Sequence, residues 1–200
     1  MQSIFKVNKV VLLILFLIPE SNIYAFLPFK ELGLITGFGY GDKPSSLPEG
    51  NYKVVYGIFH ISQNLTQYIK NENLKKGILT FYNEIQFNNV GLGNIDENFE
   101  FSSVEFGLNN GLKYMYPLLP KWYIFISGGT GPFFHTTNTL KQKKGFLFNN
   151  NFGIGTHYFI SKNFSIMAMF RLRHMSNANI WMPNNGINTY NFHAGVSYFF

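Results

Sequence analysis

The sequence predicts an all-β fold, an eight-stranded antiparallel transmembrane β-barrel. Apolar and polar residues alternate in runs of about ten, separated by Gly, Asn, Asp, Pro and Lys, whereas helical periodicity is nearly absent. Charged residues make up only 13% of the chain and aromatic residues 18%, a composition that suits a protein surrounded by lipid. After residue 25 no stretch is apolar enough for a membrane-spanning helix, so membrane insertion would require a closed sheet.

The first 25 residues have the features of a signal peptide. Lys6 and Lys9 give a positive start, the uncharged apolar segment 10–18 follows, and Ala25 offers a small residue at the cleavage point. The apolar segment is much shorter than the roughly 20 residues of a spanning helix, and polar residues follow it at once, which disfavours an uncleaved anchor. We therefore expect a signal peptide over 1–25 and an outer-membrane barrel over 26–200.

The alternation predicts eight strands. In chain order, the predicted strands are 32–41, 52–62, 78–90, 99–116, 122–135, 145–160, 163–176 and 187–200. Eight is the smallest number in the common range for outer-membrane barrels, and at this size side chains fill the interior. A pore or transporter is disfavoured for that reason.

Alternate positions within a strand divide its side chains between two faces. In 78–90 an apolar face opposes a polar one, with Leu79, Phe81, Ile85 and Phe87 on the first and Thr80, Tyr82, Glu84 and Gln86 on the second. We expect the apolar face to meet lipid and the polar face to fill the lumen. A soluble β-sandwich would show the same alternation with the faces reversed. The signal peptide and the aromatic end of the chain, 198–200, which resembles the assembly signal of bacterial outer-membrane proteins, favour the barrel.

The parity of a residue, its even or odd position along a strand, also places several charged residues inside the barrel. Arg171 and Arg173 fall on inward faces, as do Glu84 and Glu105, so we expect at least one Arg–carboxylate contact across the lumen. Two of the five histidines, His157 and His193, also point inward. The five show no metal-ligand spacing, and no zinc site is expected.

A histidine and a serine two residues apart share one face of a strand, which can place a general base near a nucleophile. His174 and Ser176 have this spacing at the end of the seventh predicted strand. By itself the signal is weak, because His60 and Ser62 have the same spacing elsewhere in the chain.

The wider pattern is more specific. Over about thirty residues, Arg171-x-Arg173-His174-x-Ser176-Asn177-Ala178, then Pro183-Asn184-x-Gly186-Ile187, then a terminal aromatic strand, the chain resembles the lipid A 3-O-deacylase family. Members of that family are eight-stranded outer-membrane barrels that remove the ester-linked acyl chain at position 3 of lipid A.

The resemblance assigns a role to each matching residue. Ser176 matches the nucleophile, His174 the general base and Asn177 a contributor to the oxyanion hole. Where the family has a glutamate twelve residues after the serine, this chain has Asn188. An asparagine oxygen can accept the imidazole N–H and fix its tautomer, but it cannot offset the charge of an imidazolium.

Parity also says where such a site would lie. The even positions of 163–176 and 187–200 form apolar rows that His174, Ser176 and Asn188 continue, so all three should face lipid near the outer leaflet. We therefore expect a serine-type esterase that acts on lipid A, or lipopolysaccharide, in the outer membrane of a Gram-negative bacterium. Neither a cofactor nor a nucleic-acid partner is implied. The alternative is a non-catalytic structural or adhesion barrel of the same ancestry.

Overall fold

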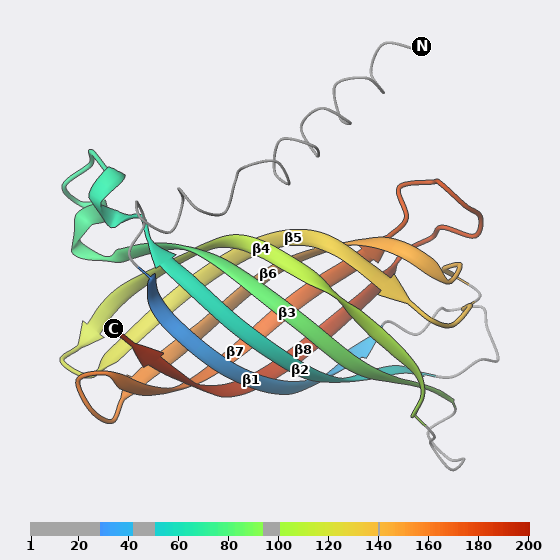
Figure 1. Ribbon diagram of the computed structural model, residues 1–200, viewed down its shortest axis with the longest axis horizontal. Helices are drawn as coiled ribbons and strands as arrows, with labels where there is room; N and C mark the ends of the chain where they lie inside the picture. The colour runs from blue at the N-terminus through green and yellow to red at the C-terminus, as the bar shows by residue number, and fades with distance from the viewer. Residues whose placement is uncertain (1–28, 42–50, 94–100, 140) are drawn as a thin grey trace, which may run out of the picture.

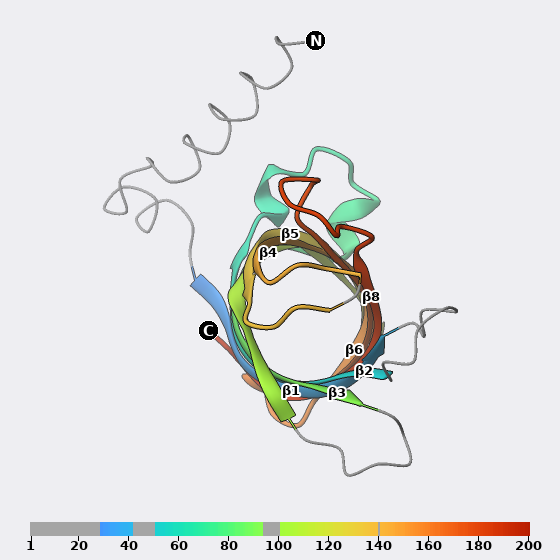
Figure 2. The same ribbon diagram turned by 90° about the vertical axis from the view of Figure 1, so that its right-hand side faces the viewer.

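The computed structural model describes residues 29–41, 51–93, 101–139 and 141–200, and these form a closed antiparallel β-barrel. Each strand pairs with its neighbours in the chain, and the last strand pairs with the first, which closes the ring seen end-on in Figure 2. The strands are β1 (Phe29–Gly41), β2 (Asn51–Asn64), β3 (Ile78–Gly93), β4 (Phe101–Leu119), β5 (Trp122–His135), β6 (Gly145–Phe159), β7 (Phe164–Ser176) and β8 (Ile187–Phe199).

The predicted fold class is confirmed, and every predicted strand end lies within about three residues of the observed one. Closure gives each strand two hydrogen-bonding neighbours, which an apolar environment requires. None of the helices in the described part of the chain has the length and apolar character to cross a membrane. The predicted signal peptide, residues 1–25, lies outside the described residues.

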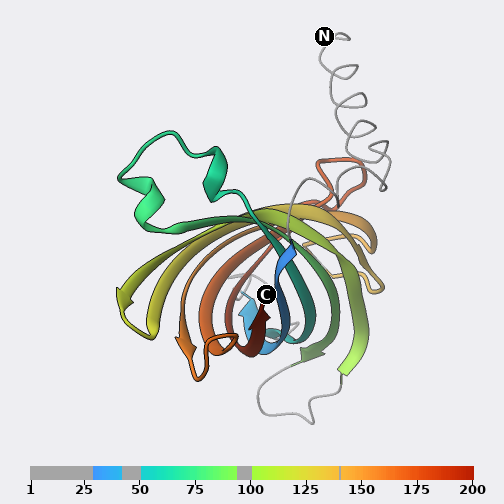
Figure 3. The same ribbon diagram turned by 60° about the vertical axis from the view of Figure 1, so that its left-hand side comes forward.

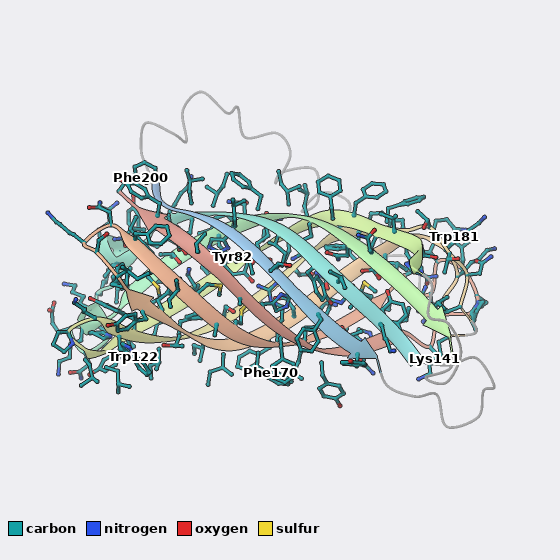
Figure 4. The ribbon with its side chains drawn as sticks, turned by 90° about the horizontal axis from the view of Figure 1, so that it is seen from below. Tyr82, Trp122, Lys141, Phe170, Trp181 and Phe200 are labelled. Atoms are coloured by element: carbon teal, nitrogen blue, oxygen red, sulfur yellow. The ribbon has the colours of Figure 1, made fainter. Side chains whose placement is uncertain are left out.

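The two faces of the sheet divide as predicted. Outward side chains are apolar and exposed, among them Phe87 on β3 and Ile154 on β6, which are 64% and 55% exposed. Inward side chains are buried, and they combine polar and charged groups with an apolar cluster that includes Met115, Phe125 and Met169. Figure 4 shows this division, with Tyr82 inside the barrel and Phe170 on its outer surface. The alternation in the sequence therefore sets which side chains face outward and which fill the lumen.

Ion pairs cross the lumen, and both predicted arginines take part. Arg171 donates two hydrogen bonds to the carboxylate of Glu84, at 2.9 and 2.8 Å, and Arg173 donates one to Glu105 at 2.8 Å. The hydroxyl of Tyr52 also donates to Glu105. The two bonds between Arg171 and Glu84 hold them in the bidentate arrangement that strengthens such pairs.

A third ion pair was not predicted from the sequence. Lys113 on β4 lies 2.6 Å from Glu31 on β1, and the hydroxyls of Ser62 and Ser197 donate to the same carboxylate. His60 lies between Glu31 and Glu84, so the second His-x-Ser pair belongs to the lumen network. His157 and His193 are buried inside the barrel as predicted.

The two ends of the barrel differ. β1 begins and β8 ends at one end of the barrel, here called the termini end, where the β4–β5 and β6–β7 turns also lie (Figure 1). The β2–β3 connection at this end is longer and carries two short 3-10 helices, η1 (Thr66–Tyr68) and η2 (Leu74–Lys76), which stand outside the barrel wall (Figure 3). The opposite end, here called the loop end, carries the β5–β6 and β7–β8 connections.

Candidate functional site

His174 and Asn188 are cross-strand partners at the loop end of the barrel. The register of β7 and β8 pairs their Cα atoms, and His174 Nδ1 lies 2.7 Å from the side-chain oxygen Oδ1 of Asn188. An amide oxygen only accepts hydrogen bonds, so this contact requires a proton on Nδ1, and in the neutral imidazole with that tautomer Nε2 carries the lone pair. Asn188 is exposed and His174 half-buried, on the outward face that parity predicts.

Gly186 holds the other side of the same imidazole. Its φ is +73°, a left-handed conformation that favours glycine, and a Cβ atom built there would lie 2.5 Å from His174 Cε1 and 3.2 Å from Nε2. Any larger residue would therefore push the ring away. The imidazole is fixed by a hydrogen bond from one direction and by close packing from another.

Ser176 lies two residues beyond His174 on the same face of β7. It is half-buried and its cross-strand partner on β6 is Phe148. Within the described part of the chain, its hydroxyl has no hydrogen-bond partner. The fold thus brings Ser176, His174 and Asn188 to one outward face at the loop end, without a hydroxyl–imidazole hydrogen bond. Catalytic hydrogen bonds of this kind are often formed only once substrate is bound.

Asn177 is buried in the loop that follows β7. Its backbone N–H donates to the side-chain oxygen of Asn184 at 2.8 Å, and its side-chain amide donates to the carbonyl of Trp181 at 2.7 Å. In this arrangement both N–H groups donate to other residues of the loop. A contribution of Asn177 to an oxyanion hole, as the sequence predicts, requires one of these donors to turn toward the substrate.

Asn184 organises the β7–β8 loop, a role that was not predicted from the sequence. Besides accepting from Asn177, it donates to the side-chain oxygen of Asn179 at 2.8 Å. Ala178 and Asn179 both have left-handed backbones, with φ of 53° and 63°, which costs about 1–2 kcal/mol at a residue other than glycine. The Asn184 bonds help to hold this turn. The only signal in the sequence was the position of Asn184 in the Pro-Asn-x-Gly-Ile motif.

A groove in the outer wall of the barrel adjoins the imidazole. It has a volume of about 470 Å³, and its lining includes His174 and Asn188 together with Phe152, Leu172 and Tyr190. The last three side chains are apolar or aromatic and lie exposed on the outer surface of the barrel. The groove therefore joins the polar groups of the site to a surface that suits an acyl chain.

The family model of the lipid A 3-O-deacylases (PagL) matches residues 70–197, more than half of the chain. The chain belongs to the lipid A 3-O-deacylase family. The match includes β7, the β7–β8 loop and β8 as far as residue 197, so all the residues of the candidate site lie within it. No curated protein sequence matches the chain.

Solved structures agree on the architecture of this lipid A 3-O-deacylase family member. The outer membrane enzyme PagL superposes with a TM-score of 0.55 at 16% identity, over 82% of this chain and 97% of PagL. Neisserial surface protein A superposes with a TM-score of 0.56 at 12% identity, over 86% and 97% of the two chains. At these identities the structural likeness shows the fold alone, and the family rests on the sequence match.

Proposed function

We propose that this protein is an outer-membrane esterase of a Gram-negative bacterium that removes an ester-linked 3-hydroxyacyl chain from lipid A. The observation that carries the proposal is the 2.7 Å contact between His174 and Asn188, next to Ser176 on the lipid-facing surface. An enzyme for a soluble substrate gains nothing from such a position, whereas the ester of a membrane glycolipid reaches it from the outer leaflet. Residues 1–25 would direct export as a cleaved signal peptide.

In the proposed reaction Ser176 is the nucleophile. Its oxygen attacks the carbonyl carbon of the ester, and His174 Nε2 takes the hydroxyl proton. The negative charge on the carbonyl oxygen is held by N–H groups of the loop that follows β7, with Asn177 as one donor. The tetrahedral intermediate then expels the sugar alkoxide, which receives the proton from His174. Water hydrolyses the acyl-serine in the second half of the cycle, with His174 again as the base.

Asn188 is the positioning residue in this scheme. By accepting from Nδ1 it keeps the imidazole in the tautomer that the reaction needs. It carries no charge, so the imidazolium formed in each half of the cycle lacks the counter-charge of the family's glutamate. We therefore expect a working enzyme with a reduced rate.

Replacing Asn188 by glutamate should raise kcat. Because the tautomer is already correct, the gain is limited to the stronger hydrogen bond between carboxylate and imidazolium, worth about 1.5–3 kcal/mol, or about 10- to 10²-fold. The measurement is single-turnover release of the 3-hydroxy fatty acid by the purified protein. Asn188→Gln is the matched control, since it has the length of glutamate without its charge and should not raise the rate. A lower rate in Asn188→Glu would show that the amide itself is required.

The function is tested by mass spectrometry of lipid A from Gram-negative cells that do or do not express the protein. Expression should produce lipid A lighter by one 3-hydroxyacyl chain, with that fatty acid released. If lipid A is unchanged, and Asn188→Glu leaves it unchanged as well, the hydrolase proposal fails. A non-catalytic barrel of the same ancestry then becomes the better description.

A further inference from the structure

A lysine-rich loop lies beside the candidate site and has no part in the chemistry proposed above. Lys141, Lys143 and Lys144 belong to the connection between β5 and β6. This connection is hydrogen-bonded to the β7–β8 loop by two backbone contacts. The N–H of Lys143 donates to the carbonyl of Pro183 at 3.1 Å, and the N–H of Asn185 donates to the carbonyl of Lys141 at 2.8 Å. A β-bridge between Gln142 and Asn184 lies between these two contacts.

Residues of the two loops line an open pocket of about 440 Å³. Its lining includes Lys143, Lys144 and Trp181, together with Phe134 and Phe146. Figure 4 places Trp181 and Lys141 at the same end of the barrel, opposite Trp122 and Phe200. A basic pocket with an indole wall suits an anionic sugar, since the ammonium groups attract the charge and the aromatic face packs against the ring.

The pocket lies close to Ser176 along β6. Phe148 is the cross-strand partner of Ser176, and its ring packs edge-on against that of Phe146 at 5.0 Å between centroids. Phe146 lines the pocket and lies two residues, or about 7 Å, further along β6 toward the loop end. A single headgroup can therefore reach from the pocket to the nucleophile.

Among the residues that the structure describes, no carboxylate balances the charges of Lys143 and Lys144. The side chains of Lys143 and Lys144 are exposed, and neither ammonium forms an ion pair or hydrogen bond with any residue that the structure describes. Of the carboxylates in the described ranges, Glu31, Glu84 and Glu105 are buried in the lumen and Glu72 lies at the termini end. Two cations that share a pocket repel each other, and an anion bound between them relieves that repulsion.

We propose that the pocket between the β5–β6 and β7–β8 loops binds a phosphate of the glycolipid headgroup, with Lys143 and Lys144 as its ligands and Trp181 against the sugar ring. The pocket then anchors the substrate so that its ester lies at Ser176. This inference rests on the proposed function for the identity of the substrate, but it makes a claim about binding that is measured separately from hydrolysis.

The experiment uses the fluorescence of Trp181. The sequence has two tryptophans, so a Trp122→Phe background leaves Trp181 as the sole reporter, and Ser176→Ala in the same protein prevents turnover. The full-length protein in detergent micelles is titrated with phosphorylated lipid A, with dephosphorylated lipid A, and with inorganic phosphate. Lys143→Gln with Lys144→Gln is the test variant. Lys75→Gln with Lys76→Gln, which removes two lysines at the termini end, is the matched control.

We expect the test variant to bind phosphorylated lipid A about 5- to 30-fold more weakly, as each lysine near an anionic surface contributes about fivefold in affinity. The control variant should bind with the affinity of the parent protein. Added salt should lower the affinity of the parent toward that of the test variant. Equal affinity of the parent for phosphorylated and dephosphorylated lipid A would overturn the proposal. So would an unchanged affinity in the test variant, or a response to inorganic phosphate as strong as that to the lipid.

The outcomes separate this inference from the proposed function. Lysine-dependent binding without any deacylation by the Ser176-containing protein would support the pocket and refute the esterase. Deacylation with an unchanged KM in the lysine variant would support the esterase and refute the pocket. If the lysine variant loses thermal stability while its affinity is unchanged, the lysines stabilise the loops and the proposed site is wrong.

Discussion

Ser176→Ala is expected to abolish release of the 3-hydroxyacyl chain from lipid A, with a fall in kcat of about 10⁴-fold or more. Removing the nucleophile of a complete serine triad lowers kcat by about 10⁶-fold. The fall expected here is smaller, because the uncharged Asn188 already lowers the rate of the parent protein. The side chain is half-buried at the end of β7 and makes no hydrogen bond within the described ranges, so its loss should leave the barrel intact. Fatty-acid release by the purified protein measures the activity. The difference in gel mobility between unheated and heated samples measures whether the barrel is folded.

The chain supplies its own control for this variant. Ser62 follows His60 at the same spacing as Ser176 follows His174, but the pair lies inside the barrel and Ser62 donates to Glu31 at 3.0 Å. Ser62→Ala should lower stability by about 1 kcal/mol, the contribution of one such hydrogen bond, and leave deacylation unchanged. Activity that survives Ser176→Ala would show that another group attacks the ester.

The largest expected effect on stability is that of Glu84→Gln. Its carboxylate accepts two hydrogen bonds from Arg171 and one each from Asn109 and Gln86, all inside the barrel. Without the charge of Glu84, the Arg171 guanidinium stays buried and uncompensated. Breaking a buried ion pair in this way costs about 3–5 kcal/mol. Urea unfolding of the protein in micelles, followed by far-ultraviolet circular dichroism, measures the change.

Two further variants make the stability test specific. Glu72→Gln removes a carboxylate that is paired with Lys75 at 2.6 Å but is exposed at the termini end, and it should leave the free energy of unfolding nearly unchanged. Combining Glu84→Gln with Arg171→Met removes both members of the buried pair, so part of the lost stability should return. If the double variant is as unstable as the sum of the single changes, the two residues are not energetically coupled.

The sequence allowed the strands and their faces to be predicted, because a barrel in lipid obeys a strict period of two. One face must be apolar along the whole strand, and a shift by a single residue would place Glu84 and Arg171 in lipid. This is why the inward positions of Arg171, Arg173 and Glu105 followed from parity alone. The outward positions of His174 and Ser176 followed in the same way.

The contacts across the lumen were only partly predictable. Parity states which side chains point inward, but the strand stagger decides which of them meet, and the stagger belongs to the closed barrel. The pair of Lys113 and Glu31 joins β4 to β1 across the interior, a separation that no local pattern in the sequence records. The same holds for His60, whose neighbours Glu31 and Glu84 come from different strands.

The sequence by itself determined the fold class, the strand limits and the outward face on which His174, Ser176 and Asn188 lie, since all of these follow from local alternation and a linear motif. Only the tertiary structure decided how the β7–β8 loop is held. Asn184 bonds Asn177 and Asn179, Gly186 packs against His174, and the lysine-bearing β5–β6 loop is hydrogen-bonded alongside. Loop geometry depends on side chains that meet across a turn or between two loops, and their spacing in the sequence carries no period that would reveal the contact.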